Sequence, residues 1–308
     1  MIGAHVLVDH SGCLLDCFAA SEKPALTPND LRHDNSLDYA ANATTTGLQN
    51  PAILLAAKLE DKTPTRIQLC GRLAVQLAGR ELTESLPGGQ ARVLFTFLVM
   101  SRALPARRDE LIEALWPWRA PAGADPSLSA LLSRLRAVLG ADVLTGRFEI
   151  RMRLPRDTWV DFEAAEEAIH RAESAVAQGD WSRGWGPSLV ALFTARRGFL
   201  AGEDLPWAEE YRRRLEAIRC SALECYAAVA LGVGGTELAP GERVARELVV
   251  VEPFHERAHA LLMEILVARG NAAEALRVYE GLRKRLRDEL GATPAPELRA
   301  LQERLLRR

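Results

Sequence analysis

The chain has 308 residues, of which 48% are apolar and 26% are charged, and its formal net charge is −2. These values indicate a soluble globular protein of two or three domains. The longest apolar run, VLFTFLVM, is far shorter than the roughly 20 residues that cross a membrane, and the N-terminus lacks the basic start of an export signal.

The five cysteines argue against both a disulfide framework and a metal site. Their number is odd, and no pair has the two-residue spacing typical of zinc or redox sites. They are Cys13, Cys17, Cys70, Cys220 and Cys225. We therefore expect no metal, no cofactor and a reducing cytoplasm as the compartment. The last two cysteines are expected to pack on one long helix rather than act as redox sensors.

Residues 1–63 differ in kind from the rest of the chain. They carry 4 Lys and Arg against 8 Asp and Glu, and the stretch NDLRHDNSLDYAANATTTGLQN is polar, with turn formers and no sustained period. We expect most of the segment to be flexible, so that removing residues 1–60 leaves the rest of the fold nearly intact. A small appended element and a later translation start remain open alternatives.

Only the segment 64–160 is basic, with 14 Lys and Arg against 9 Asp and Glu. Such a balance is typical of a small nucleic-acid-binding domain, although a solvated arginine-rich surface gives the same count. Charge alone leaves both interpretations open.

The same segment has a regular order of expected elements. Residues 66–82 alternate apolar and polar residues around Gly71 and Gly79, as short antiparallel strands do. Residues 90–102 and 107–116 each have apolar residues at helical steps, and the second helix must stop at Trp116, before a proline.

A third helix and a hairpin complete this order. Residues 125–140 begin with Asp125 placed to cap and Pro126 at the first helical position, and they end at Gly140. Residues 143–155 have the pattern of a hairpin. Strands, three helices and a hairpin form a winged helix, whose third helix lies in the DNA major groove.

The third helix has two distinct faces. Its buried stripe, at steps of four, three and four, consists of Leu128, Leu132, Leu135 and Leu139. The opposite face consists of Pro126, Ala130, Ser133, Arg134 and Ala137, with Arg136 on the flank. Small residues permit close approach to base edges, and Arg134 is able to form a bidentate contact with guanine. An ordinary amphipathic helix, whose solvent face has no binding role, has the same pattern.

The C-terminal half has the pattern of stacked helix pairs. Gly234 and Gly270 each separate two apolar-periodic segments, and Ala245 and Ala275 recur in the helices that follow them. This imperfect repetition near 34 residues is typical of tetratricopeptide-like repeats. The expected packing residues of the last pair are Leu262, Leu266, Ala275 and Tyr279. A plain helical bundle predicts the same apolar positions without a binding groove.

The stretch HERAH, residues 255–259, has the H-E-x-x-H spacing of zinc peptidases. We do not predict a peptidase, because Arg257 stands where such helices pack into the protein and no third ligand follows His259. Glu256 and Arg257 are instead expected on the surface of a scaffold helix. The stretch GVGG at 232–235 lacks a complete phosphate-binding motif and is expected to be a loop.

Longer stretches resemble a known family. The pieces GQARVLFTFLV, RRDELIEALWP, SLSALLSRLRAVLG and TGRFEI resemble the OmpR/PhoB-type winged helix of the antibiotic regulatory proteins (SARP family). The pieces VDFEAAEEAI, WAEEYRRRLEAIRCSALE and PFHERAHALLMEILVARGNAAEALRVYEGLRKRL resemble their bacterial transcriptional activator domain. The resemblance covers about 240 of the 308 residues.

The resemblance implies a mainly α protein with three parts. These are residues 1–63, a winged-helix domain with short strands and a hairpin wing at 64–160, and an all-α tetratricopeptide-like domain at 161–308. The implied function is a cytoplasmic transcriptional regulator, expected to be an activator without enzymatic activity, that binds double-stranded promoter DNA. The helical domain then serves homodimerisation or contact with RNA polymerase. The alternative is an interaction scaffold that has lost DNA binding.

The expected site residues lie on the third helix, the wing and one loop. We expect DNA contacts from Ser129, Ala130, Ser133, Arg134, Arg136 and Arg147, the last two to phosphates. The resemblance assigns the loop WPWRAPAGA to RNA polymerase, with Trp118 and Arg119 as the contact residues. In the alternative, Trp118 folds back onto the helices as part of the core.

Overall fold

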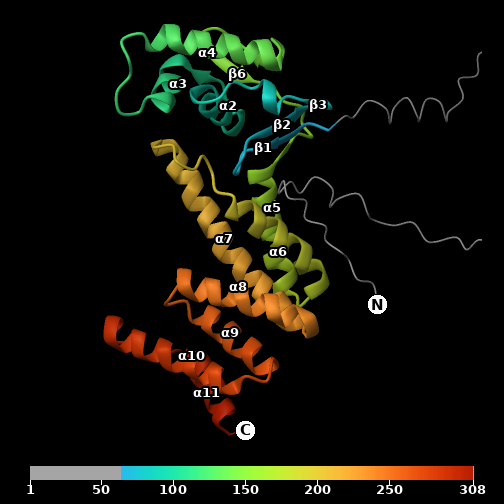
Figure 1. The fold of residues 1–308 in the computed structure, drawn as a ribbon, viewed down its shortest axis with the longest axis vertical. Helices are drawn as coiled ribbons and strands as arrows, with labels where there is room; N and C mark the ends of the chain where they lie inside the picture. The colour runs from blue at the N-terminus through green and yellow to red at the C-terminus, as the bar shows by residue number, and fades with distance from the viewer. Residues whose placement is uncertain (1–63, 308) are drawn as a thin grey trace, which may run out of the picture. The chain divides into compact units, whose positions relative to one another are not determined.

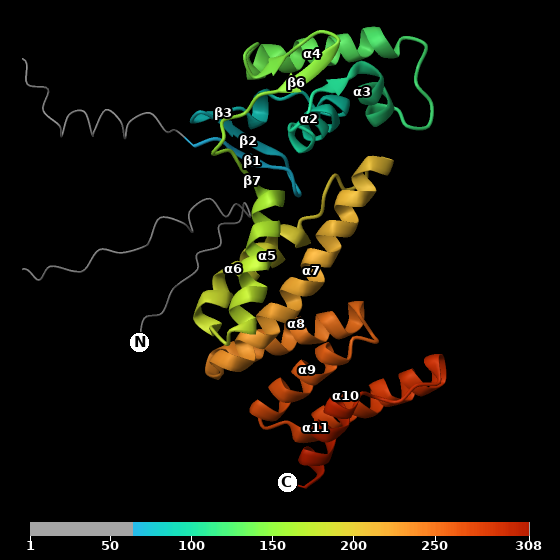
Figure 2. The same ribbon diagram turned by 180° about the vertical axis from the view of Figure 1, so that it is seen from behind.

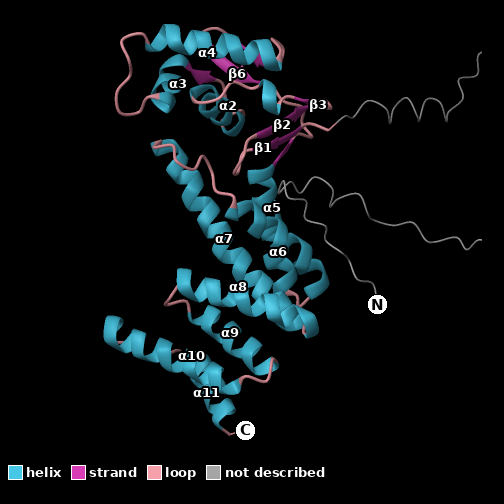
Figure 3. Ribbon diagram, in the orientation of Figure 1, coloured by secondary structure: helices cyan, strands magenta, loops and turns pink. Residues whose placement is uncertain are grey.

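A computed structural model describes residues 64–307. The expectations for residues 1–63, Cys13 and Cys17 included, lie outside this part. The described chain is mainly helical, as Figure 3 shows, with short strands confined to its first hundred residues. None of the helices in residues 64–307 combines the length and apolar character needed to cross a bilayer.

A small sheet opens the described chain. Its four strands lie in the order β3-β2-β1-β7, where β7 is parallel to β1 and the other pairs are antiparallel. The strands are β1 (Arg66–Gln68), β2 (Ala74–Leu77), β3 (Arg80–Glu81) and β7 (Trp159–Val160). Figure 2 shows β7 beside β1. The expected turns at Gly71 and Gly79 are present, with φ of 75° and 77°, a region that favours glycine.

Three helices and a second, three-stranded sheet complete a winged helix. A single 3-10 turn (Thr83–Ser85) precedes them. The helices are α2 (Gln90–Met100), α3 (Arg108–Leu115) and α4 (Ala124–Leu139). The strands β4 (Ala106–Arg107), β6 (Glu149–Met152) and β5 (Leu144–Thr145) pair in that order, and β5 and β6 form the wing.

The start of α4 predicted from the sequence is too late in the chain. The helix begins at Ala124 rather than Pro126, and its N-cap is Gly123, without a side-chain cap. Asp125 therefore lies in the first turn, where its carboxylate accepts a hydrogen bond from Arg108 instead of capping. Pro126 is tolerated because the first N–H groups of a helix have no intrahelical acceptor. The predicted end at Gly140, with φ of 101°, is confirmed.

The buried face of α4 is the one that the sequence predicts. Leu128, Leu132, Leu135 and Leu139 are all buried, and they pack within the core formed with α2 and α3. Burial of such side chains is worth roughly 1.5–3 kcal/mol each. This core fixes the orientation of α4, so the opposite face is presented to solvent.

The remaining residues form the helical domain (Figure 1). Its helices are α5 (Asp161–Ala177), α6 (Trp181–Arg196), α7 (Pro206–Val233), α8 (Leu238–Val251), α9 (Glu256–Ala268), α10 (Ala272–Arg285) and α11 (Pro296–Leu306). A 3-10 turn (Gly235–Glu237) precedes α8, and a π-helical turn (Leu286–Leu290) follows α10. Helices consecutive in the chain from α5 to α11 pack on one another.

The residues expected to pack between the helices are buried, as predicted. The buried residues include Ala245, Leu262, Leu266, Ala275 and Tyr279. Gly234 and Gly270 end α7 and α9 in backbone conformations with φ of 71° and 82°.

One expectation in this domain is wrong. The stretch 232–235 is not simply a loop, because Gly232 and Val233 belong to the last turn of α7. Gly232 lies against Trp181, and a Cβ at position 232 would fall 2.4 Å from the indole ring. The glycine therefore serves close packing of α7 against α6.

A buried carboxylate joins the two domains. Asp161, the first residue of α5, is fully buried and accepts hydrogen bonds from the backbone N–H groups of Leu69 (2.7 Å) and Cys70 (3.1 Å) in the β1–β2 turn. Arg197 donates to the same carboxylate at 3.1 Å. Burial raises the pKa of Asp161, and these donors oppose that shift.

The cysteines of the helical domain are packing residues, as expected. Cys225 is buried and Cys220 is half-buried on α7. Burial raises the pKa of the Cys225 thiol to about 12 and that of Cys220 to about 11. Both side chains are therefore thiols near neutral pH, the form that is a poor nucleophile.

Candidate DNA-binding surface

The solvent face of α4 contains the residues that the sequence assigns to DNA. Ser129, Ala130, Ser133 and Arg134 are exposed. Within residues 64–307 the Arg134 side chain takes part in no hydrogen bond or ion pair, so its guanidinium is available to a ligand. Short side chains around one long cation permit close approach of a helix to base edges.

Arg108 connects three elements at one end of this face. It lies at the first position of α3, and its guanidinium donates to the Asp125 carboxylate (2.8 Å) and to the Ser129 hydroxyl (2.8 Å). A longer contact of 3.4 Å reaches the carbonyl of Arg147 in the wing. Asp125 is thereby paired with a cation, which reduces its repulsion of phosphate.

Arg136 connects α4 to the wing. Its Nε donates to the carbonyl of Leu144 at 3.0 Å, and its Nη2 donates to the carbonyl of Gly146. The side chain is half-buried, whereas Arg147 at the wing tip is exposed. Arg136 therefore supports the wing, a role that the sequence did not suggest.

A cleft of about 420 Å³ separates α4 from the wing tip. It is lined by Arg108, Asp125, Ser129, Leu132, Arg136, Arg147 and Phe148. Phe148 is 78% exposed beside Arg147. Sequence reasoning missed both Phe148 and Arg108. A signal for Arg108 existed, because a cation in the first turn of a helix opposes the helix dipole and needs a compensating partner.

The loop between α3 and α4 keeps its tryptophan in solvent. Trp118 is 72% exposed, which excludes the alternative in which it joins the core. Its Nε1 donates to the Asp204 carboxylate of the α6–α7 turn at 3.1 Å. Arg119 is exposed, and in the described part of the chain its side chain makes no ion pair. The two residues thus form an accessible aromatic and cationic pair.

The HERAH stretch is part of helix packing. His255 is the N-cap of α9, and His259 is 2% exposed, with its Nδ1 at 3.1 Å from the carbonyl of His255. Arg257 is exposed, as expected, but Glu256 is half-buried and accepts from the backbone N–H of Ala295, which precedes α11. Residues 64–307 contain no group of three or more His, Cys, Asp or Glu side chains placed to hold a metal.

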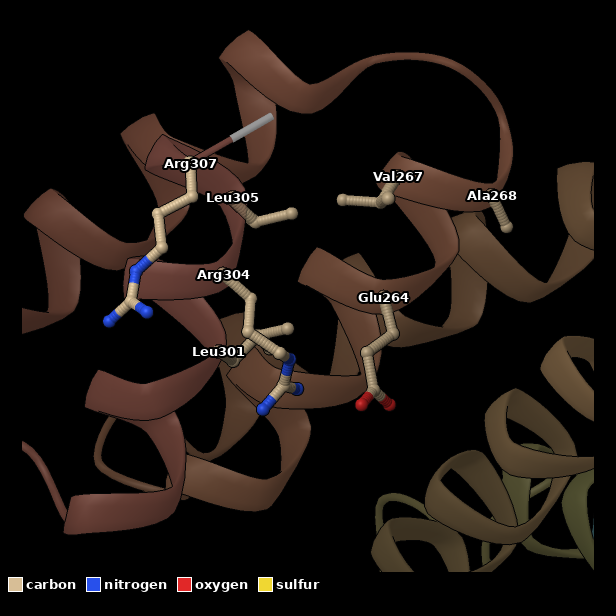
Figure 4. A pocket seen from close by; sticks show the side chains of 7 residues that line it. All are labelled: Glu264, Val267, Ala268, Leu301, Arg304, Leu305 and Arg307. Carbon is tan, nitrogen blue, oxygen red and sulfur yellow. The ribbon is translucent and has the colours of Figure 1, made fainter.

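A second cleft lies between α9 and α11 (Figure 4). Its volume is about 630 Å³. It is lined by Glu264, Val267, Ala268, Leu301, Arg304, Leu305 and Arg307. Figure 4 shows Glu264 and Arg304 extending toward the same side, with Val267 and Leu305 facing each other across the opening.

Comparison with known proteins finds regulatory proteins among the relatives of this chain. Residues 160–306 match the bacterial transcriptional activator domain. The regulatory protein AfsR of Streptomyces griseus is 35% identical over 237 residues, which are 74% of this chain and 23% of that protein. AfsR of Streptomyces coelicolor is 33% identical over 253 residues, 81% of this chain and 25% of that protein. The chain thus spans about a quarter of these relatives.

A solved structure is similar to most of this chain. The Mycobacterium tuberculosis protein EmbR, determined in complex with a low affinity phosphopeptide, matches with a TM-score of 0.63 and 26% sequence identity. The match covers 79% of this chain and 65% of that one. The match agrees with the fold described above, a winged helix followed by helical repeats.

Proposed function

Because the chain belongs to the antibiotic regulatory protein family, we propose that it regulates transcription by binding promoter DNA through its winged helix. The observation that carries the proposal is the solvent face of α4. Small exposed side chains surround Arg134, and the buried leucines hold this face outward. A recognition helix needs this combination to enter the major groove.

The wing supplies the second contact. Arg147 lies at its exposed tip, and Arg136 holds the wing against α4. We assign phosphate contacts to both arginines, and base-edge contacts to Ser129, Ala130, Ser133 and Arg134. Few side chains read bases directly, so DNA shape and cooperative binding of two copies contribute to specificity.

The helical domain and the α3–α4 loop serve partners other than DNA. We propose that the chain activates transcription without catalysis of its own, with Trp118 and Arg119 contacting RNA polymerase. Exposed Trp and Arg side chains are enriched among residues that dominate binding energy. The helical repeats, including the cleft between α9 and α11, then serve homodimerisation or a further contact with the transcription machinery.

A mobility shift on the DNA upstream of its own gene tests the DNA-binding proposal. We expect specific binding that weakens steeply with salt, because phosphate contacts release counterions. Random DNA of the same length is the control. Equal affinity for both, or no binding at low salt, would support the alternative scaffold and contradict the proposal.

The loop proposal has its own test. The double variant Trp118→Ala, Arg119→Ala should abolish activation in a reconstituted transcription assay, while DNA affinity and melting temperature stay unchanged. Both side chains are exposed, so little burial is lost. Activation that survives the double substitution would place the polymerase contact elsewhere, and the helical domain is then the region to search.

A further inference from the structure

The loop assigned to the polymerase is attached to the helical domain through its tryptophan. The indole N–H of Trp118 donates to Asp204, which lies 86 residues further along the chain, while 72% of the side chain remains exposed. One edge of the ring is therefore held and the rest faces solvent. This arrangement differs from both a buried core tryptophan and a freely rotating one.

The turn that carries Asp204 is itself held in place. Arg212 on α7 donates to three backbone carbonyls of this turn, those of Phe199 (3.0 Å), Leu200 (2.6 Å) and Glu203. Its side chain is 24% exposed. Asp204 thus extends from a backbone segment held by three hydrogen bonds, which limits the positions available to its carboxylate.

A second tryptophan fixes the base of the loop. Trp207, at the start of α7, donates from its indole N–H to the carbonyl of Ala114 in α3 at 3.0 Å. Its ring packs edge-on against Phe97 of α2, with ring centroids 5.1 Å apart. The segment 203–207 therefore meets α3 and the following loop at two separate points.

We propose that Asp204 is a positioning residue for activation, which holds the Trp118 indole in the orientation that RNA polymerase recognises. The inference rests on the proposed polymerase contact and deepens it. A side chain ordered before binding loses less conformational freedom when the partner arrives. The helical domain thereby controls the shape of a loop on the DNA-binding domain, so activation depends on Asp204 while DNA binding does not.

Substitutions at the two ends of the hydrogen bond test this role. Trp118→Phe keeps an aromatic ring but removes the N–H, and Asp204→Ala removes the acceptor. Each is expected to lower activation by about 2- to 10-fold, the range of one hydrogen bond. The double variant should lose no more than either single one, because both changes break the same bond. DNA affinity should not change in any of them.

Glu203→Ala is the matched control. Glu203 is exposed beside Asp204, and in the described residues its carboxylate makes no hydrogen bond or ion pair. Its substitution should leave activation unchanged. A loss equal to that of Asp204→Ala would mean that the acidic turn acts through its charge, and the positioning role would be wrong.

A spectroscopic readout separates positioning from direct contact. With 5-fluorotryptophan incorporated at the six tryptophans, Trp118→Phe identifies the ¹⁹F resonance of Trp118 by its loss. Asp204→Ala should shift this resonance in the free protein, before polymerase is added. An unchanged resonance, or additive losses of activation in the double variant, would overturn the inference.

The outcomes also distinguish this inference from the function on which it rests. If Trp118→Ala abolishes activation and Asp204→Ala does not, the polymerase contact stands and the positioning role fails. If activation survives Trp118→Ala, the polymerase contact itself fails, and the positioning role is overturned with it.

Discussion

Arg134 and Arg147 are both exposed arginines, and the difference in their surroundings is the reason that we propose different roles for them. Arg134 lies on the exposed face of α4 among small residues, where two N–H groups of its guanidinium are able to reach a base edge. Arg147 lies at the tip of a hairpin, where a phosphate is the nearest expected group. Arg136 differs from both, because its hydrogen bonds to the carbonyls of Leu144 and Gly146 commit part of its guanidinium to the wing.

Arg134→Ala should weaken binding to the specific site by about 1–3 kcal/mol and relax the preference at one base position. Arg147→Ala should instead weaken binding to all sequences alike and lower the salt slope by about one. Fluorescence anisotropy with specific and random duplexes over a range of salt concentrations measures both effects. Equal losses of Arg134→Ala on the two duplexes would show that Arg134 contacts only phosphate.

His259 should make stability depend on pH. Burial lowers the pKa of the His259 imidazole, and the nearby positive charge of Arg285 lowers it further. The contact between this imidazole and the His255 carbonyl acts in the opposite direction, without reversing the shift. The unfolded chain therefore takes up a proton near pH 6.5, whereas the folded chain resists it until lower pH. The free energy of unfolding should consequently fall as the pH drops below about 6.5.

Urea unfolding at pH 7.5 and 5.5 checks this expectation. His259→Gln should lose less stability between the two values than the wild type does, because glutamine does not titrate. His170→Gln is the control, since its imidazole is 79% exposed. A wild-type loss that His259→Gln retains in full would assign the pH dependence to other groups.

At the scale of single elements, apolar spacing predicted most of what the structure contains. The leucine stripe of α4 and the buried positions of α9 and α10 follow from periodicity, because burial of one face is a local requirement. The start of α4 did not follow, because the Arg108 partner of Asp125 lies on another helix. The contact between Trp118 and Asp204 leaves no local pattern at all, since it joins segments distant in sequence.

Gly232→Ala should destabilise the helical domain. The new methyl group would lie 2.4 Å from the Trp181 ring, so the indole or α7 must shift. Such overpacking costs about 1–3 kcal/mol, more than the roughly 0.5–1 kcal/mol that alanine gains over glycine within a helix. The melting temperature should therefore fall.

Gly281→Ala provides the matched comparison within α10. A Cβ at that position would lie more than 4 Å from every atom outside the neighbouring backbone of α10. The substitution therefore changes only the intrinsic helix propensity of the residue. This variant should be more stable than the wild type by about 0.5–1 kcal/mol in urea unfolding. A Gly232→Ala variant that gains stability in the same way would show that the α6–α7 contact is looser than described.

At the scale of the whole described chain, the two domains share one buried junction. Asp161 accepts hydrogen bonds from the β1–β2 turn and from Arg197, and an aromatic cluster lies beside it. Phe162 and Phe199 belong to this cluster, with ring centroids 5.6 Å apart. A shared core of this kind favours unfolding of both domains in one transition.

Asp161→Ala should cost about 3 kcal/mol, because it leaves two backbone N–H groups without their acceptor and the half-buried guanidinium of Arg197 without its carboxylate. Differential scanning calorimetry should then resolve two transitions where the wild type has one. Glu84→Ala is the control, since its ion pair with Arg72 is exposed and worth little. A single transition in Asp161→Ala would mean that the aromatic cluster alone couples the domains.

The strand β7 pairs in parallel with β1, at the edge of the first sheet. The strand that completes the first sheet also leads directly into α5, so no linker separates the winged helix from the helical domain. A gene fusion that exchanged winged helices between relatives would need its crossover point beyond Asp161. An earlier crossover would pair β1 and the β1–β2 turn of one parent with an edge strand and an acceptor for two backbone N–H groups from the other parent. We therefore expect an exchange of winged helices between relatives to preserve the fold only when β7 and Asp161 move together with the winged helix.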